Sequence, residues 1–150
     1  MKTINIQLAI LFLLTFTISG FCQKLASNDY YNYKSMDPVE WALALDAVIA
    51  APKNHKIILE NDTVRVLEVT IAPGESENLH HHKWPSVIYF QEADEFIDKD
   101  VDGKIIFDSR KLKAPSKTPM TIWKDSEAAH SISNLSNTKS IKLIRVEVKQ

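Results

Sequence analysis

The chain has 150 residues, a formal net charge of −1, 45% hydrophobic residues and 25% charged residues. This length suffices for one domain with its own core, because a domain of this size buries roughly 70% of the surface that its unfolded chain exposes. The ordinary composition argues against a disordered, collagen-like or disulfide-stabilised protein. Acidic and basic residues are interspersed, and without a basic stripe to neutralise phosphates the chain is not expected to bind nucleic acid.

The first 22 residues have the features of a secretory signal peptide. Lys2 precedes an apolar-rich run from Leu8 to Ile18, which a serine and a glycine follow. The run is shorter than the roughly 20 residues that a spanning helix needs, so no stable membrane span is expected. Residues 1–22 are therefore expected to be removed and the protein to be secreted or periplasmic. A lipid anchor on Cys22 is the alternative.

Two short regions precede the main part of the chain. Residues 23–36 mix polar residues and tyrosines without any period, and we interpret them as a flexible leader. A helix is expected over about residues 37–51, because Asp37 is a good N-cap, Pro38 suits the first helical position and Pro52 ends the run. Its apolar residues recur at helical spacing, so one stripe is expected to pack across an outer face of a sheet.

From about residue 55 to residue 149 the apolar pattern changes to a period of two, and β-branched residues dominate. Strands are expected at residues 57–59, 64–71, 87–90, 105–107, 121–123 and 141–148. Turn signals separate them at Asn61-Asp62, Pro73-Gly74 and Asp102-Gly103. Many short strands with turns between them, and one helix, predict an all-β antiparallel sandwich or small barrel.

The most informative stretch contains three consecutive histidines. His80 and His82 are two apart on an expected strand, so both point to the same face, whereas His81 points to the other. Two imidazoles on one face can share a metal ion when a third ligand arrives from another strand, and His130 is the candidate. A solvated loop of histidines is the alternative. His55, in the polar junction after the helix, is not expected to be a ligand.

The spacing of these histidines resembles the motifs of a known family. Gly74, five residues, His80, one residue and His82 resemble the first cupin motif. His130, three residues and Asn134 resemble the end of the second motif, in which the asparagine is a structural turn residue. The resemblance extends over residues 55–149 and implies a cupin-type antiparallel jelly-roll β-barrel with the one N-terminal helix outside it. It also implies a metal held at one end of the barrel, commonly by three histidines and a glutamate.

The chain departs from this pattern at the glutamate. That residue should fall at or next to Val87, where the chain has Ser86 and Val87. Glu127 near the second motif is interpreted as an acid of a surface loop, with a replacement acid near the site as the alternative. Three neutral imidazoles still make a workable site for Fe, Mn, Zn, Cu or Ni, with open positions for a ligand. Without a carboxylate the ion keeps more positive charge, which favours an anionic small molecule.

Some further side chains receive an expected place. Counting by two along the strand puts Val87 and Tyr89 on one face, which we expect to line the inside of the barrel together with Phe107. Trp123 is expected in the core.

The sequence therefore predicts an exported cupin that binds a divalent metal through His80, His82 and His130 and a small organic molecule in its barrel. If it is an enzyme, metal-dependent oxygenation or isomerisation is expected, and the sequence identifies no catalytic residue. The alternative is a non-catalytic module that binds a small ligand or a partner protein, with a degenerate metal site. The resemblance leaves a homodimer formed through the sheets open.

Overall fold

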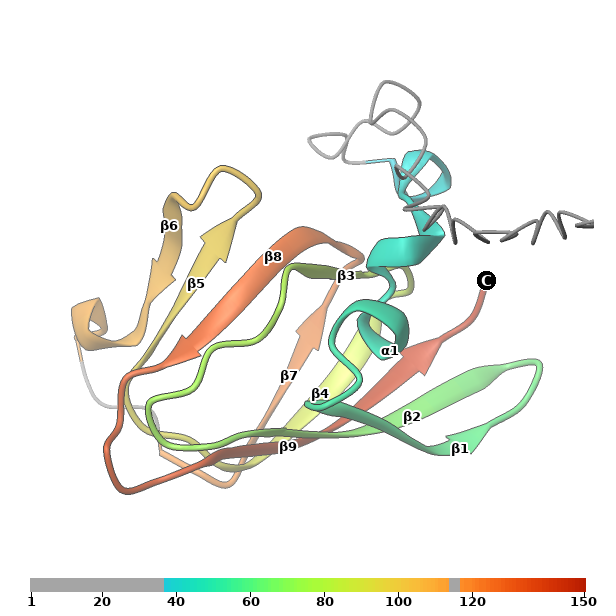
Figure 1. Ribbon diagram of the computed structural model, residues 1–150. Coiled ribbons are helices and arrows are strands. Elements are labelled where there is room, and N and C mark those ends of the chain that lie inside the picture. The colour runs from blue at the N-terminus through green and yellow to red at the C-terminus, as the bar shows by residue number, and fades with distance from the viewer. Residues whose placement is uncertain (1–36, 114–116) are drawn as a thin grey trace, which may run out of the picture.

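A computed structural model describes residues 37–113 and 117–150. Their strands form two β-sheets that face each other as the two walls of a barrel (Figure 1). The larger sheet has the strand order β1-β2-β9-β4-β7, and the smaller sheet has the order β3-β8-β5-β6. All these neighbouring strands run antiparallel, so the predicted jelly-roll class is confirmed. The strands are β1 (His55–Glu60), β2 (Val64–Ile71), β3 (His80–His82), β4 (Ser86–Glu92), β5 (Phe96–Asp100), β6 (Ile105–Asp108), β7 (Met120–Lys124), β8 (Glu127–Asn134) and β9 (Ile141–Val148).

Strands β2 and β9 lie side by side in the larger sheet, and their bounds coincide with the strands predicted at 64–71 and 141–148. Alternate residues of each strand are buried, and Val69 pairs with Leu143 while Ile71 pairs with Ile141. Burying an aliphatic side chain of this kind stabilises a fold by about 1.5–3 kcal/mol. The buried core cluster consists of Leu67, Val69, Ile71, Ile88, Ile141 and Leu143.

Strands β5 and β8 were not predicted from the sequence. Strand β8 contains alanine, serine and glutamate, and β5 contains three charged residues, so neither segment has a high intrinsic preference for a strand. They pair with each other from Phe96↔Asn134 to Asp100↔His130, which satisfies their backbone hydrogen-bonding groups. Pairing within the smaller sheet, rather than local propensity, therefore makes these segments strands.

The prediction that Val87 and Tyr89 line the inside of the barrel and that Trp123 is in the core is wrong. These side chains are 37%, 43% and 56% exposed, and Val87 pairs with Trp123 on the outer face of the larger sheet. Because side chains alternate along β4, Ser86 and Ile88 take the interior positions instead. The period of two identified the strand without identifying its inner face.

The expected helix over residues 37–51 is divided into short turns. Asp37 caps the first turn as predicted, but the backbone is extended at Ala42 and again at Asp46 (ψ 122° and 137°). Asp46 starts a new cap at this point, and its carboxylate also binds the buried Arg65, which draws the chain inward. The turns are η2 (Pro38–Glu40), η3 (Leu43–Leu45) and α1 (Ala47–Ala50), and a further one, η4 (Ser109–Lys111), follows β6.

Residues 37–54, which we call the N-terminal segment, cover the side of β3 that faces away from the barrel interior. The Trp41 ring centroid lies 5.2 Å from that of His81. His81 Nε2 donates a hydrogen bond to the Ala42 carbonyl at 2.9 Å, and Asp46 forms a parallel bridge with His81. Figure 1 shows α1 in front of the barrel, close to β3. His81 therefore points away from the interior, as predicted, yet it is buried.

Two predicted turns require glycine. Gly74 and Gly103 have φ angles of 72° and 77°, a left-handed conformation that favours glycine because it has no Cβ. The Asn134 Nδ2 atom donates to the Ile71 and Ala72 carbonyls, both at 3.1 Å, just before the first of these turns. Asn134 thus has the structural turn role that the motif implied.

Candidate metal centre

The three histidines predicted as metal ligands converge inside the barrel. His80 and His82 lie on the inner side of β3, and His80 pairs in register with His130 of the adjacent strand β8. The His80 ring centroid lies 5.0 Å from that of His82 and 4.7 Å from that of His130, and His82 and His130 are 5.7 Å apart. All three are almost fully buried. The alternative of a solvated histidine loop therefore does not apply.

His55 joins this cluster, although the sequence interpretation set it aside as a residue of a polar junction. It is the first residue of β1, and its pairing with the buried Val69 turns it into the barrel. Its ring centroid lies 4.6 Å from that of His80 and 5.2 Å from that of His82. His55, His80 and His82 each offer a ligand atom, and these atoms lie within 4.8 Å of one another. The apolar run of residues 57–59 does not alternate, so the sequence gives no signal for the face on which His55 lies.

The hydrogen bonds of the four inward-facing imidazoles leave the same nitrogen free in each ring. Every Nδ1 atom contacts an acceptor oxygen: for His55 the Ala51 carbonyl (3.3 Å), for His80 the Asn78 carbonyl (2.8 Å), for His82 Glu147 Oε1 (2.8 Å) and for His130 the Ala128 carbonyl (3.0 Å). A carbonyl oxygen can only accept, so Nδ1 carries the proton in the neutral ring and Nε2 has the lone pair. This is the tautomer that an Nε2 metal ligand needs.

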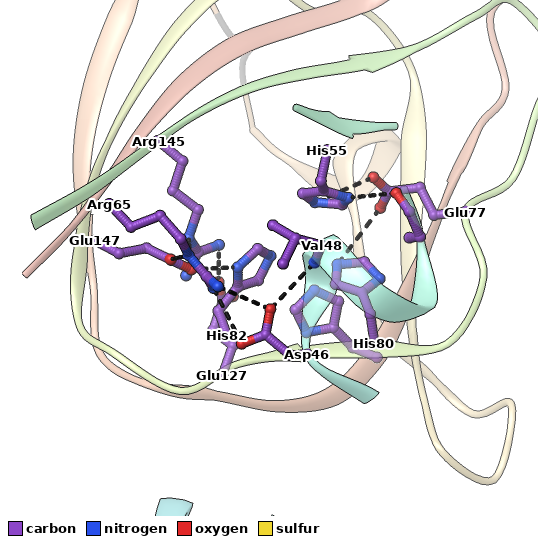
Figure 2. Close-up of polar contacts among 12 residues, drawn as sticks. Asp46, Val48, His55, Arg65, Glu77, His80, His82, Glu127, Arg145 and Glu147 are labelled. Atoms are coloured by element: carbon purple, nitrogen blue, oxygen red, sulfur yellow. Dashed lines mark hydrogen bonds and ion pairs between the residues drawn. The ribbon is translucent and has the colours of Figure 1, made fainter. Parts of the chain in front are cut away.

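A carboxylate from outside both motifs also reaches the cluster. Glu77 precedes β3, and its side chain is 1% exposed. Its Oε1 lies 3.7 Å from His55 Nε2, and its Oε2 lies 4.0 Å from His80 Nε2, as Figure 2 shows. These distances are too long for hydrogen bonds. Two ligand atoms each about 2.1 Å from one ion, however, lie roughly 3–4 Å apart. Glu77 therefore fits as a ligand that shares an ion with these imidazoles.

The position at which the cupin pattern expects a glutamate has a different role here. Ser86 is fully buried and pairs with Glu147 of β9, whereas Val87 points outward. Glu77, three residues before His80, instead brings a carboxyl group close to the imidazoles. Neither motif fixes the position of Glu77, so the spacing of the histidines gives no signal for it.

Burial shifts the pKa values of several inward-facing groups away from their values in water. It lowers the pKa of His55 from 6.5 to about 4 and, helped by neighbouring positive groups, holds the pKa of His80 and His82 well below 6.5. Burial also raises the pKa of Glu77 to about 8. The imidazoles of His55, His80 and His82 are thus neutral at neutral pH, which is the form that binds a metal.

His130 has acidic neighbours on its other side. Asp98, Glu127 and His130 each offer a ligand atom, and these atoms lie within 4.8 Å of one another. Glu127 is bound by Lys124 at 2.8 Å and by Arg145 at 2.6 Å. Burial opposes its ionisation, but the charges of Arg145, His130 and Lys124 hold the pKa of Glu127 at about 2. Glu127 therefore lies inside the barrel and not, as expected, on a surface loop, and it serves two cations.

A cavity of about 350 Å³ adjoins the imidazoles. Its walls come from both sheets, and most of the side chains beyond the histidine end are apolar. Phe107 contributes to them, as predicted. These apolar residues are Val69, Ile71, Ile88, Phe90, Ala93, Phe96, Phe107, Leu112, Met120, Ile122, Ile132 and Leu143. A pocket of this size with a few polar groups at one end is typical of a site for a small organic molecule.

Comparison with solved structures finds the same architecture. A cupin domain from Bordetella pertussis Tohama I has a TM-score of 0.52 at 17% sequence identity, covering 64% of this chain and 92% of that chain. This chain has the cupin fold. An RmlC-like cupin with a double-stranded β-helix fold from Methanocaldococcus jannaschii follows (12% identity, TM-score 0.47, 63% of this chain and 78% of that chain). No protein-family model and no curated protein matches the sequence.

A chain of hydrogen bonds connects the imidazole of His82, inside the barrel, to Asp46 of the N-terminal segment. Glu147 accepts from His82 Nδ1 with one oxygen and from the Nε of Arg65 with the other. Arg65 in turn donates to both carboxylate oxygens of Asp46, at 2.9 and 3.2 Å. Figure 2 shows this chain of side chains, all of them buried. Partners of this kind fix the orientation of a histidine ligand and raise its basicity.

Two predictions made from the sequence concern residues outside the described part of this chain. The signal peptide at 1–22 and the flexible leader at 23–36 both lie there. Within residues 37–113 and 117–150, the helices are too short or too polar for any of them to cross a membrane.

Proposed function

We propose that this cupin binds one divalent metal ion at the histidine end of its cavity. The proposed ligands are His55, His80 and His82, whose ligand atoms lie within 4.8 Å of one another, with the carboxyl group of Glu77 near two of them. His130, the third histidine predicted from the sequence, is proposed as a further ligand because its ring centroid lies 4.7 Å from that of His80, and its ligand atom also groups with those of Asp98 and Glu127. The observation that carries the proposal is the common arrangement of the four buried imidazoles, each with Nδ1 bound to an acceptor and Nε2 free. Free Nε2 lone pairs that line one end of a cavity can be shared by a single ion.

The donor set restricts the metal. Imidazole nitrogens with one carboxylate suit Fe, Mn, Zn, Cu or Ni, whereas Ca²⁺ and Mg²⁺ prefer oxygen ligands. Such an ion supplies Lewis-acid polarisation of a ligand oxygen. The protein's own residues hold the imidazoles in the ligating tautomer, and the apolar walls exclude water from the cavity.

The molecule bound in the cavity is a small organic compound, and metal-dependent oxygenation or isomerisation is the proposed reaction. Support comes from the apolar cavity of about 350 Å³ beside the imidazole cluster. The second candidate is a non-catalytic binding module. It is favoured by the replacement of the motif glutamate, because Ser86 and Val87 offer no carboxylate. Turnover of a bound compound by the metal-loaded protein, absent from the metal-free protein, separates the two.

Export is a part of the proposal that rests on the sequence of residues 1–22 alone. Expression of the full chain in a bacterium is expected to give a periplasmic or secreted protein that starts at Gln23. Mass spectrometry of the N-terminal peptide in each cell fraction checks this. A cytoplasmic protein that keeps residues 1–22 contradicts it.

Metal analysis of the protein without a histidine tag tests the metal site. We expect one ion per chain by elemental analysis, and full reloading of the chelated protein by Zn²⁺ or Co²⁺. The variant His80→Ala should bind the ion at least about 100-fold more weakly, because loss of an outer partner alone costs 10–100-fold.

The neighbouring His81→Gln variant is the matched control, since His81 lies on the same strand and points the other way. It should bind metal as the wild type does. Absence of any bound metal, together with no uptake on titration, overturns the proposed site. Equal losses in the two variants point to a disturbed fold instead of lost ligation.

A further inference from the structure

The cavity extends across the smaller sheet from the histidines to β6. His80 and His82 lie on β3, at one edge of this sheet, and Phe107 lies on β6, at the other edge, with β8 and β5 between them (Figure 1). The two histidines are almost fully buried, whereas Phe107 and Leu112, which also line the cavity, are 38% and 41% exposed. Because Phe107 faces the interior and is nevertheless exposed, the cavity opens to solvent beside apolar side chains at its β6 side.

The wall between this opening and the histidines is apolar. Phe90, Phe96, Met120 and Ile122 line it, and the ring centroid of Phe96 lies 5.3 Å from that of Phe107. Polar groups placed against these side chains would lose hydrogen bonds with water without gaining new ones. The part of a ligand that lies here is therefore apolar.

The two cations that line the cavity are bound to one acid. Arg145 Nη1 donates to Glu127 Oε2 at 2.6 Å, and Lys124 Nζ lies 2.8 Å from Glu127 Oε1. The Nε and Nη2 atoms of Arg145 have no hydrogen-bond partner among the described residues, but the surrounding protein encloses them. These donors do not reach the cavity, so Arg145 offers no paired edge to an anionic ligand.

With one divalent ion bound, the charges around the histidine end balance. The two charges of the ion, with Arg145 and Lys124, give four positive charges. Four carboxyl groups balance them when ionised: Glu77, Asp98 and Glu127, which line the cavity, and Glu147, which accepts from His82. Arg65 and Asp46 behind them bind each other. A further buried charge of either sign would be unpaired and costly, and without the ion the excess of acids also opposes an anion.

We propose that the cavity binds a small, uncharged and largely apolar molecule, and that the charged side chains around the histidines exclude ions of similar shape. The volume of about 350 Å³ is near the lower end of the roughly 300–1,000 Å³ typical of ligand pockets, which suits a molecule of one or two rings. The sequence favoured an anionic ligand, because it indicated no carboxyl group beside the ion. This specificity rests on the proposed ligand-binding role of the cavity, but it does not require the metal ion.

Three probes of nearly equal shape test this specificity: the neutral 1-naphthalenemethanol, the anion 1-naphthoate and the cation 1-naphthylmethylammonium. Binding to the Zn²⁺-loaded protein is measured by calorimetry or naphthalene fluorescence, and the alcohol and the anion are also compared on the metal-free protein. We expect the alcohol to bind at least about 10-fold more tightly than either ion in the loaded protein, and than the anion in the metal-free protein. The reason is that burying an unpaired charge costs more than burying a hydroxyl group.

Variants then locate the bound alcohol and the groups that exclude the anion. Phe107→Ala removes part of the cavity wall and should weaken alcohol binding by about 10-fold, whereas Ile106→Ala, at an exposed neighbour that does not line the cavity, should not change it. Asp98→Asn removes a negative charge from the histidine end, so it should bind the anion about threefold more tightly and the alcohol as before. Glu68→Gln, on the outer side of β2, is the matched charge control and should change neither.

The outcomes separate this specificity from the metal site. Binding of either ion as tightly as the alcohol, or no binding of any probe, overturns it. If 1-naphthoate binds more tightly than the alcohol only with Zn²⁺, the ion receives the carboxylate, which overturns the exclusion of anions and supports the metal site. Equal losses in Phe107→Ala and Ile106→Ala, or an anion affinity that Asp98→Asn leaves unchanged, also contradict the proposal. A preference for the alcohol in the metal-free protein that depends on Phe107 supports it even if no native metal is found.

Discussion

The barrel and the N-terminal segment contribute to the candidate centre in different ways. The barrel provides the groups that face the cavity, because strand pairing sets His80 beside His130 and turns His55 inward. The segment provides acceptors behind them, through the Ala51 carbonyl and the carboxylate of Asp46. Strands thus position the ligand atoms, and the short turns of the segment orient the rings from outside. The following predictions test whether this division holds, beginning with the largest effect.

Replacing His55 by alanine should weaken Zn²⁺ binding by about 100-fold, because it removes one imidazole of a shared set. The measurement is competition of the metal-free protein with a chelator of known affinity. Lys56→Ala, one residue later on the outward side of β1, is the control and should bind as the wild type does. Unchanged affinity in His55→Ala would restrict the site to the three histidines found from the sequence.

Metal binding at pH 7 should release about one proton. A carboxyl group with a pKa near 8, as for Glu77, is about 90% protonated at pH 7 and must lose its proton to ligate. The imidazole of His55, with a pKa near 4, is already neutral and releases none. Affinity should therefore fall by about tenfold from pH 9 to pH 7.

Calorimetry in buffers with different ionisation enthalpies counts the released protons. In Glu77→Gln the release at pH 7 should fall to near zero, since only neutral histidines remain. Release near zero in the wild type would mean that Glu77 does not take part in binding.

Replacing Asp46 by asparagine should weaken metal binding by about fivefold, less than the 10–100-fold typical of a direct partner of a ligand. Asparagine also caps a helical turn well, so α1 should form, but the charge that holds Arg65 and Glu147 behind His82 is lost. The absorption spectrum of bound Co²⁺ should shift, which a purely structural change would not cause.

Controls for this variant come from the same segment. Asp46→Glu should restore the spectrum, and Asp37→Asn, which changes another cap, should leave both affinity and spectrum unchanged. A normal Co²⁺ spectrum in Asp46→Asn would show that the segment covers the barrel without orienting its ligands.

Some features followed from local sequence and were confirmed. The runs rich in β-branched residues at 64–71 and 141–148 marked two strands with correct bounds. The spacing of His80 and His82 placed them on one face and His81 on the other. The motif asparagine and the two turn glycines also have the roles expected of them, because each depends on a few adjacent residues.

Other features depended on partners far along the chain. The second break in the expected helix falls at Asp46, whose carboxylate binds Arg65, 19 residues later. Glu127 lies inside because Arg145 and Lys124 bind it there. Neither contact can be predicted from the residues adjacent in sequence to Asp46 or Glu127.

By itself, the sequence determined the class of fold, most of its strands and the histidines that share a face. Local periodicity is sufficient for these, because it depends on backbone geometry within a few residues. Only the tertiary structure decided which face of β4 is inner, that β5 and β8 are strands, and that His55 and Glu77 join the centre. These depend on register between strands distant in sequence, where a shift of one residue exchanges the two faces.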